Sequence, residues 1–371
     1  LGNLMTNADG ITIVNSAIVT TTATQTYNDD VILGTSGTGN VITTFNGTDL
    51  SFNDTVDAAV GETQGMVANG TGVTKFGDAA TDDNVGGVNP AFAGSGALSS
   101  LTTDLAPAIV SGTTQINSAT VNTTGDQTYN DAVNVGTSGT GNNVTTLNGN
   151  DITFNLTVDG DGTTASIEDL TVNSSTVGPD IGVATFGDAM GDDNVGGTTP
   201  LGNLITNADG ETDINSTSVT TSADQIYHDD VIIGTSGAGA LLTTLNGVNI
   251  TFNGTVDADA AGIESLLVNG SGVTTFGDAA LDDNVGGVND NMAFVGSGAL
   301  ANLTTDDGVG ADTTVINSAF VTTTLDQTYN DAVTLGTSGM GNVVTTFTGN
   351  NLTFNGTVDG AAAGTQDLVA N

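Results

Sequence analysis

The sequence predicts an all-β protein whose chain winds as a parallel β-helix, or β-solenoid. Three observations predict it: near-copies of a unit about a hundred residues long, a shorter period of about 25 residues inside each unit, and short apolar runs separated by Gly, Asn, Asp or Ser. A fixed period of roughly 20–50 residues is typical of architectures in which each repeat packs only on its neighbours. We therefore expect one continuous solenoid over residues 1–371.

Aromatic residues anchor the shorter period. In every copy a Tyr, in TYND or a close variant, is followed 25 residues later by a Phe, and in three copies a second Phe follows in the phrase FGD. The anchors are Tyr27, Tyr129, Tyr227 and Tyr329, then Phe52, Phe154, Phe252 and Phe354, then Phe76, Phe186 and Phe276. A Leu-Thr-Thr-Asp phrase at Leu101 and Leu303 fills the fourth place. We therefore expect four coils of about 25 residues in each hundred-residue repeat.

The long repeats divide the chain at 1–104, 105–200, 201–306 and 307–371. The first phrase, LGNLMTNADG, returns at Leu201, and the last residues match the middle of earlier copies. Both ends therefore cut through a repeat. We expect the chain to be a section of something longer, or one link in a polymer.

Within each coil, runs of four to six residues alternate in the manner of strands. In VITTFNG-TDLSFND-TVDAA, for example, Phe45, Leu50, Phe52 and Val56 can point inward while Thr, Asn and Asp point outward. No sustained helical period is present. Tandem β-sandwich repeats of a hundred residues are the alternative architecture. The β-helix is favoured because similar phrases recur four times within each hundred residues.

Composition restricts the partners. The chain has 42 acidic residues, one Lys, no Arg and one His, which gives a formal net charge of −41. Nothing here can neutralise nucleic-acid phosphates, and anionic membrane surfaces are repelled. No apolar run approaches the roughly 18–20 residues of a membrane span, so we expect no membrane insertion. Cys is absent, so neither disulfides nor thiolate metal sites can form.

The repeated phrases TTxxDQTYNDAVxLGTSG, LTFNGTVDG and VxTFGDAxxDDNVGG resemble the β-strand repeats of giant bacterial surface proteins related to filamentous-haemagglutinin-type adhesins. The resemblance covers essentially the whole chain. The family often has Gly-Gly where this chain has Gly-Asp, Asn-Asp or Asp-Asp, so the chain resembles an acidic variant. The resemblance implies a right-handed β-helix exported to the cell surface and used in adhesion, fibres or cell coats. It carries over no catalytic motif.

A column of aspartates is the first candidate site. An Asp lies about two residues beyond each coil anchor, and such residues should stack on one edge of a β-helix about 4.8 Å apart. Its members are Asp29, Asp54, Asp78, Asp104 and Asp131, and, after a break at Leu156, Asp188, Asp229, Asp278, Asp306 and Asp331. Stacked carboxylates repel, and hard oxygen ligands suit calcium. The column therefore predicts Ca²⁺ sites, with solvated turn aspartates as the alternative.

A second candidate is the turn GDAATDDNVGG and its two copies. Several side-chain oxygens fall within one turn at Asp82, Asp83, Asp192, Asp193, Asp282 and Asp283. The pattern is neither an EF-hand loop nor the nonapeptide calcium repeat. The alternative interpretation is a polar corner with Asx-turns and Gly at positive φ. His228 replaces the Asn of the other copies, and Lys75 replaces a Thr; both are expected at the surface.

These features predict a non-catalytic extracellular structural protein: a segment of a bacterial surface filament, fibre or cell coat. Its expected partners are copies of itself, end to end or side by side, or a continuing longer chain. The alternative is the stalk of a large adhesin that binds surface glycans or other cells. A polysaccharide-active enzyme is disfavoured by the regular repeats and the lack of bases, and an ice-binding face by the absence of Thr-x-Thr in every coil.

Overall fold

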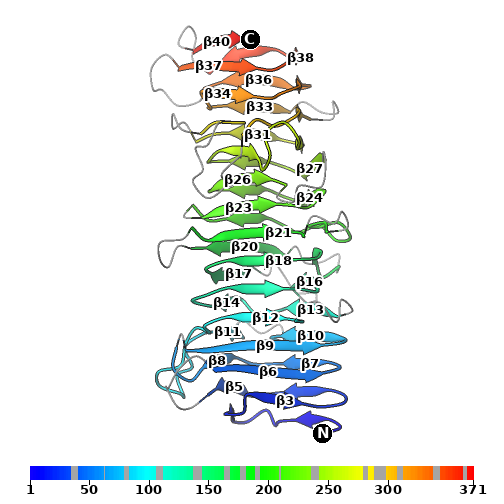
Figure 1. Cartoon of the computed structure of the whole chain (residues 1–371), viewed down its shortest axis with the longest axis vertical. Coiled ribbons are helices and arrows are strands. Elements are labelled where there is room, and N and C mark those ends of the chain that lie inside the picture. The colour runs from blue at the N-terminus through cyan, green and yellow to red at the C-terminus, as the bar shows by residue number, and fades with distance from the viewer. Residues whose placement is uncertain are drawn as a thin grey trace. The chain divides into compact units, whose positions relative to one another are not determined.

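The structure is a computed structural model. It describes residues 1–34, 41–61, 63–78, 83–105, 112–136, 144–162, 168–175, 181–188, 193–208, 210–234, 242–278, 283–287, 298–306, 312–336, 343–361 and 366–371. All the regular elements among these residues are β-strands, and the chain divides into two compact units, Leu1–Thr185 and Phe186–Asn371. In each unit the strands stack in parallel (Figure 1).

The first unit has three sheets, here called its first, second and third faces. The first face contains β1 (Leu4–Met5), β4 (Gln25–Tyr27), β7 (Leu50–Phe52), β10 (Val73–Phe76), β13 (Thr113–Ile116), β16 (Ala132–Val135) and β19 (Val158–Gly160). The second face contains β2 (Ile11–Val14), β5 (Asp30–Leu33), β8 (Val56–Ala58), β11 (Asn84–Val85), β14 (Thr120–Asn122), β17 (Val144–Gly149) and β20 (Asp169–Ser174). The third face contains β3 (Ile18–Thr20), β6 (Val41–Gly47), β9 (Gln64–Gly70), β12 (Leu101–Thr103), β15 (Gln127–Tyr129) and β18 (Ile152–Phe154). Along the chain, β21 (Val183–Phe186) spans the boundary.

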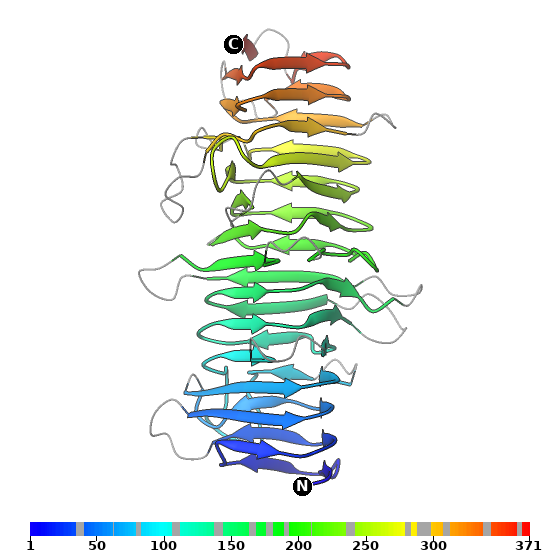
Figure 2. The same ribbon diagram turned by 45° about the vertical axis from the view of Figure 1, so that its right-hand side comes forward.

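The second unit also has three faces, which are named separately here and which successive strands visit in the order first, third, second (Figure 2). Its first face contains β22 (Leu204–Thr206), β25 (Gln225–Tyr227), β28 (Ile250–Phe252), β31 (Val273–Phe276), β33 (Thr313–Ile316), β36 (Ala332–Leu335) and β39 (Val358–Gly360). Its second face contains β24 (Ser218–Thr220), β27 (Leu242–Gly247), β30 (Ser265–Gly270), β32 (Leu303–Thr305), β35 (Asp326–Tyr329) and β38 (Asn351–Phe354). Its third face contains β23 (Glu211–Ile214), β26 (Asp230–Ile233) and β29 (Val256–Ala258), then β34 (Phe320–Thr322), β37 (Val343–Thr348) and β40 (Gln366–Ala370), and single bridges through Val285 join the two groups.

Most strands pair in parallel with the strand three places along the chain, so three strands usually complete a turn, although β30 pairs with β32 and β31 with β33. This is the arrangement expected for a parallel β-solenoid. The expected register of the aromatic anchors is confirmed: Tyr27 pairs with Phe52, and Phe52 with Phe76. Their rings stack in the core, with centroids 5.1 Å and 5.6 Å apart. A Phe from the third face, Phe45, meets this stack edge-on at 82°.

A buried Gln completes the core at each Tyr. The Tyr129 hydroxyl donates to Gln127 Oε1 at 2.9 Å, and Gln127 Nε2 donates to the carbonyl oxygen of Asn148 at 2.9 Å. The phenol therefore keeps a partner where water is excluded, as a buried polar group must. The same Tyr–Gln bond recurs at Tyr27, Tyr227 and Tyr329.

Four equal coils per hundred residues are not confirmed. Leu101, the counterpart of Leu4, lies in β12, eleven strands after β1. Because three strands make a turn, eleven strands stop one strand short of four turns. The repeated phrase therefore moves from the first face at Leu4 to the third face at Leu101, and in the second unit from the first face at Leu204 to the second face at Leu303.

Candidate functional site

The aspartate of each TYND phrase is buried and held by two threonines. In the best-defined case, Asp131 accepts hydrogen bonds from Thr103 Oγ1 at 2.7 Å and from Thr114 Oγ1 at 2.9 Å to each carboxylate oxygen. Thr103 and Thr114 belong to the turn before, so the contact joins neighbouring turns. We call this arrangement the threonine clamp. The other clamped residues are Asp29, Asp229 and Asp331.

The clamp has one fixed spacing. The second threonine always lies 17 residues before the aspartate, as at Thr12 and Asp29 or at Thr212 and Asp229. Hydroxyl donors occupy both oxygens of Asp229, with bonds of 2.6 Å and 2.8 Å to Oδ1 and 3.0 Å to Oδ2. These carboxylates are thus bound within the fold, which favours a structural role over open cation sites.

Burial still disfavours the charged form of the clamped aspartates. Burial raises the pKa of Asp229 to about 7, although the Thr206 and Thr212 hydrogen bonds lower it and so partly offset the effect. The pKa of Asp131 is raised for the same reason, again against the hydrogen bonds of its two threonines. Removing water disfavours the charged form of a carboxyl group, and hydrogen bonds to that form favour it.

The predicted aspartate column is only partly assembled. Asp29, Asp54 and Asp78 each follow a paired anchor by two residues on the first face, so these three lie at successive levels. They do not share one environment, because Asp29 is buried, Asp54 is half-buried and Asp78 is exposed. Asp54 Oδ1 accepts the backbone N–H of Thr55 at 2.9 Å, as in a local turn.

Asp104 and Asp131 do not continue that column. Thr103 pairs with Tyr129 on the third face, which places Asp104 level with Asn130 rather than with Asp131. The second unit repeats this offset, since Thr305 pairs with Tyr329 and the Asn330 side chain donates to the carbonyl oxygen of Asp306 at 2.8 Å. Asp188 and Asp278 are exposed. An unbroken edge of carboxylates is therefore absent from the described residues.

The second acidic motif closes its own turn. Asp83 Oδ2 accepts the backbone N–H of Asp78 at 2.7 Å, and Asp193 and Asp283 do the same for Asp188 and Asp278 at 3.0 Å and 2.9 Å. Gly77, at the start of the turn, has a φ of 84°. The polar-corner interpretation thus fits these residues, because a side-chain oxygen caps the turn and Gly supplies its positive φ. Asp82, Asp192 and Asp282 lie outside the described residues.

Asp104 is the predicted residue with the most unusual surroundings. It has a φ of 46°, is 3% exposed, and its Oδ2 has no hydrogen-bond partner among the described residues. Burial, followed by the charge of Asp131, raises its pKa to about 7, although the backbone of Gly70 lowers it. A surface cavity of about 410 Å³ is lined by Asp104 with the polar residues Thr21, Asn46 and Asn69.

The sequence did not predict the threonine clamp. It also did not point to Asp57, a further buried aspartate. The signal for the clamp was present as a Thr 17 residues before each TYND aspartate. His228 is exposed, as expected, and its Nδ1 lies 2.6 Å from Asn253 Nδ2. Lys75 is half-exposed. No three His, Cys, Asp or Glu side chains among the described residues come together in a way that could hold a metal ion.

The described residues contain no helix with the length and apolarity that crossing a bilayer requires. Comparisons of the chain with protein-family models, with curated proteins and with solved structures found no match.

Proposed function

We propose that this chain is a non-catalytic structural segment of an extracellular bacterial filament, fibre or cell coat. The observation that carries the proposal is how the acidic residues are used. The aspartates that sequence patterns offered for chemistry mostly bind the fold to itself, as in the clamp at Asp131 and the turn closure at Asp83. A partner would then contact the extended surface of the fold, as is usual for solenoid proteins.

Assembly with further β-coils is part of this proposal. Among the described residues β1 pairs only with β4, and β40 only with β37, so each leaves one edge open. Met5 and Leu368 are exposed beside these edges. Open strand edges template further pairing. A further turn of the same chain, or of another copy, would cover both the edges and the apolar side chains.

Electron microscopy of the complete mature protein at the cell surface tests this role. We expect ordered fibres or a coat, and labelling of intact cells by antibodies to this segment. Dispersed monomers that never associate, or labelling only after the cells are broken, would count strongly against the proposal.

An adhesin stalk that binds glycans is the second candidate. Its support is the resemblance of the repeated phrases. A glycan array that retains this segment alone would favour adhesion through the repeats. Assays with acidic polysaccharides should show no turnover, and turnover would overturn the non-catalytic assignment.

We propose Asp104, rather than the predicted aspartate column, as the site of calcium binding. The residue is 3% exposed, its Oδ2 has no hydrogen-bond partner among the described residues, and the cavity that it lines is also lined by Asn and Thr residues, whose side-chain oxygens are of the hard type that Ca²⁺ prefers. In physiological salt with excess Mg²⁺, Ca²⁺ should raise the melting temperature. The rise should disappear in Asp104→Asn and persist in the exposed control Asp78→Asn. An unchanged response in Asp104→Asn would exclude this site.

A further inference from the structure

In the first unit, a segment covers the outward side of the second face. This segment, Gly86–Gly96, is here called the strap. It is fastened by two hydrogen bonds between Ala58 and Gly96, of 3.1 Å and 3.2 Å, and by a bond of 3.1 Å from the Gly61 N–H to the carbonyl oxygen of Gly94. Nearer its start, the Asn89 side chain donates to Asp30 Oδ2 at 2.6 Å.

Two side chains beneath the strap point outward and yet are completely buried. Ile32 of β5 pairs with Asp57 of β8, and both are 0% exposed. Their neighbours along the strands, including Val56 and Ala58, fill the core. Because successive side chains of a strand point to opposite faces, Ile32 and Asp57 face away from the core. The strap is the segment bonded across this side of the strands.

The Asp57 carboxyl group has little to stabilise its charge. Neither of its oxygens makes a hydrogen bond of normal geometry among the described residues. Burial raises its pKa to about 7; the backbone of Gly87 and the Thr55 hydroxyl lower it, whereas Asp30 and Asp54 raise it further. The charged groups that act on Asp57 are thus both acidic. The entire chain has only one Lys and one His, Lys75 and His228, to set against them.

The residues that correspond to Asp30 and Ile32 and the length of the strap vary together among the internal repeats. Repeat one has Asp30, Ile32 and the long stretch GGVNPAFAGSGAL, and repeat three has Asp230, Ile232 and GGVNDNMAFVGSGAL. Repeat two has Ala132 and Asn134 at the corresponding strand positions, and a short GGTTPLGN. Residues that change together are expected to act together.

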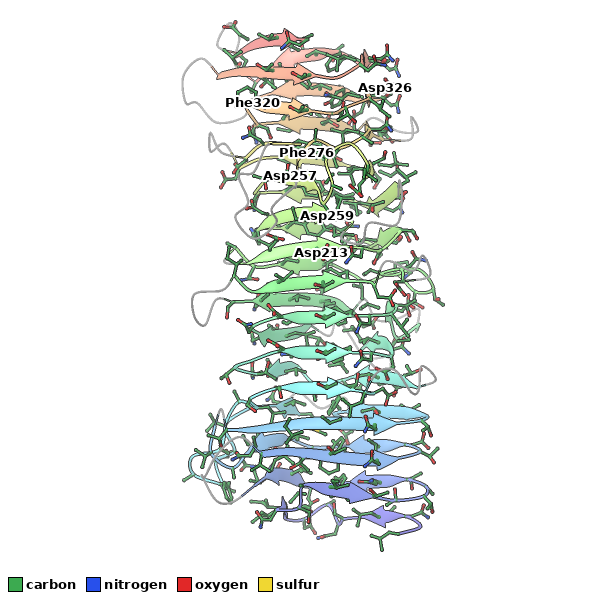
Figure 3. All side chains as sticks on the ribbon, viewed as in Figure 1. Asp213, Asp257, Asp259, Phe276, Phe320 and Asp326 are labelled. Carbon is green, nitrogen blue, oxygen red and sulfur yellow. The ribbon has the colours of Figure 1, made fainter. Side chains whose placement is uncertain are left out.

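The second unit repeats the fastening. Ala258 and Gly298 exchange hydrogen bonds of 2.9 Å and 3.0 Å, and Ile232 and Asp257 are both 0% exposed. Figure 3 labels Asp257. Residues 288–297 lie outside the described residues, so the comparison rests on the two ends of this second stretch.

We propose that the strap is a proton-controlled latch, closed over Asp57 while this carboxyl group is protonated and released when it ionises. An ionised Asp57 would face Asp30 and Asp54 without water, whereas an open strap would let water solvate it. Opening would also uncover Ile32 next to Ile13, its paired neighbour, which is already partly exposed. The latch therefore has two states. In the closed state Asp57 is protonated and covered, and in the open state Ile32 and Ile13 are exposed to solvent. This inference does not rest on the proposed structural role.

Hydrogen exchange of the whole chain, followed by mass spectrometry of peptides from the strap, tests the latch. Exchange is compared from about pH 5 to pH 9 after correction for intrinsic rates, in EDTA so that no cation can replace the proton. Linkage of one proton to closure predicts that opening becomes about tenfold more favourable per pH unit between the open-state pKa, near 4, and the closed-state pKa, about 7, and levels off above about pH 7. Strap exchange that does not change over this range would overturn the proposal.

Matched variants separate the latch from general stability. Asp57→Asn keeps the shape and removes the charge, so its strap should stay closed and lose the pH dependence. Asp159→Asn, the same change in repeat two, which has no long strap, should leave the pH dependence of the first strap intact. As a second measurement, carbon NMR of Asp57 in the unaltered chain should show it titrating near pH 7. Normal pH dependence in Asp57→Asn, or a carboxyl titrating near 4, would exclude the latch.

Discussion

At the scale of single residues, buried carboxylates link neighbouring turns of the fold through hydrogen bonds. The threonine clamp supplies Asp131 with hydroxyl donors from the preceding turn. Such donors matter because an unsatisfied buried carboxylate costs more than the bond itself contributes. The clamp thereby links two parts of the chain that lie far apart in the sequence, and the same threonine spacing recurs in every copy.

Replacing Thr114 by Val should destabilise the first unit. The change keeps the side-chain shape but removes both hydrogen bonds from Thr114 to Asp131. We expect a loss of about 1–3 kcal/mol in the free energy of unfolding, measured by denaturant titration. Thr102→Val, at a half-buried outward position in the neighbouring strand, is the control and should change little. Equal effects of the two changes would show that the clamp contributes no specific stability.

At the scale of elements, strand pairing places the aromatic rings directly above one another. Tyr227, Phe252 and Phe276 stack with centroids 5.3 Å and 5.1 Å apart and nearly parallel planes. Parallel in-register pairing puts like residues level on successive strands, so an aromatic repeat becomes a continuous stack. This stack forms a large part of the core where the strands themselves are only three or four residues long.

Truncating the middle ring should therefore be costly. Phe252→Ala removes a fully buried ring between two others and leaves a cavity, for which we expect a loss of about 3–5 kcal/mol. Phe320→Ala is the matched control, because Phe320 is 51% exposed (Figure 3). The unfolding midpoint should fall sharply for the first change and hardly move for the second. Similar midpoints would mean that the stack adds little to stability.

Much of this element-level structure could be predicted from the sequence. The alternation in VITTFNG and the 25-residue spacing of Tyr27 and Phe52 led to the parallel pairing and the core rings. The number of strands per repeat could not be predicted, because most strands have only two to four residues and are separated by turns of similar composition. The strand count matters for the site: because eleven strands separate Leu4 from Leu101, Asp104 lies beside Asn130 and not in line with Asp78.

At the scale of the whole molecule, the dominant property is negative charge that the fold partly buries. The formal net charge is −41, and several carboxyl groups, including Asp57 and Asp229, lie in the interior of their units with pKa values raised to about 7 by burial. A group whose pKa is higher in the folded state stabilises the fold below its unfolded pKa, near 4. That contribution disappears as the pH rises through 7.

The protein should therefore be more stable in mild acid than at alkaline pH. The melting temperature should fall steadily as the pH is raised from about 5 to about 8, because the folded state binds more protons over this range. Self-repulsion of the net charge acts in the same direction and is screened by salt, whereas the buried part is not. Scanning calorimetry at high salt isolates the buried contribution. A melting temperature that rises with pH under these conditions would contradict this assignment.

Copies of a repeated phrase lie on different faces of a unit, and this limits how many copies one partner can contact. Within the first unit the TYND phrases at Tyr27 and Tyr129 lie on different faces, and so do those at Tyr227 and Tyr329 in the second. A rigid bivalent ligand pressed against one side of a unit could therefore engage only one copy of its epitope, and would gain no avidity there. The copies of the epitope instead face in different directions. Such a geometry favours cross-linked meshes over flat parallel bundles.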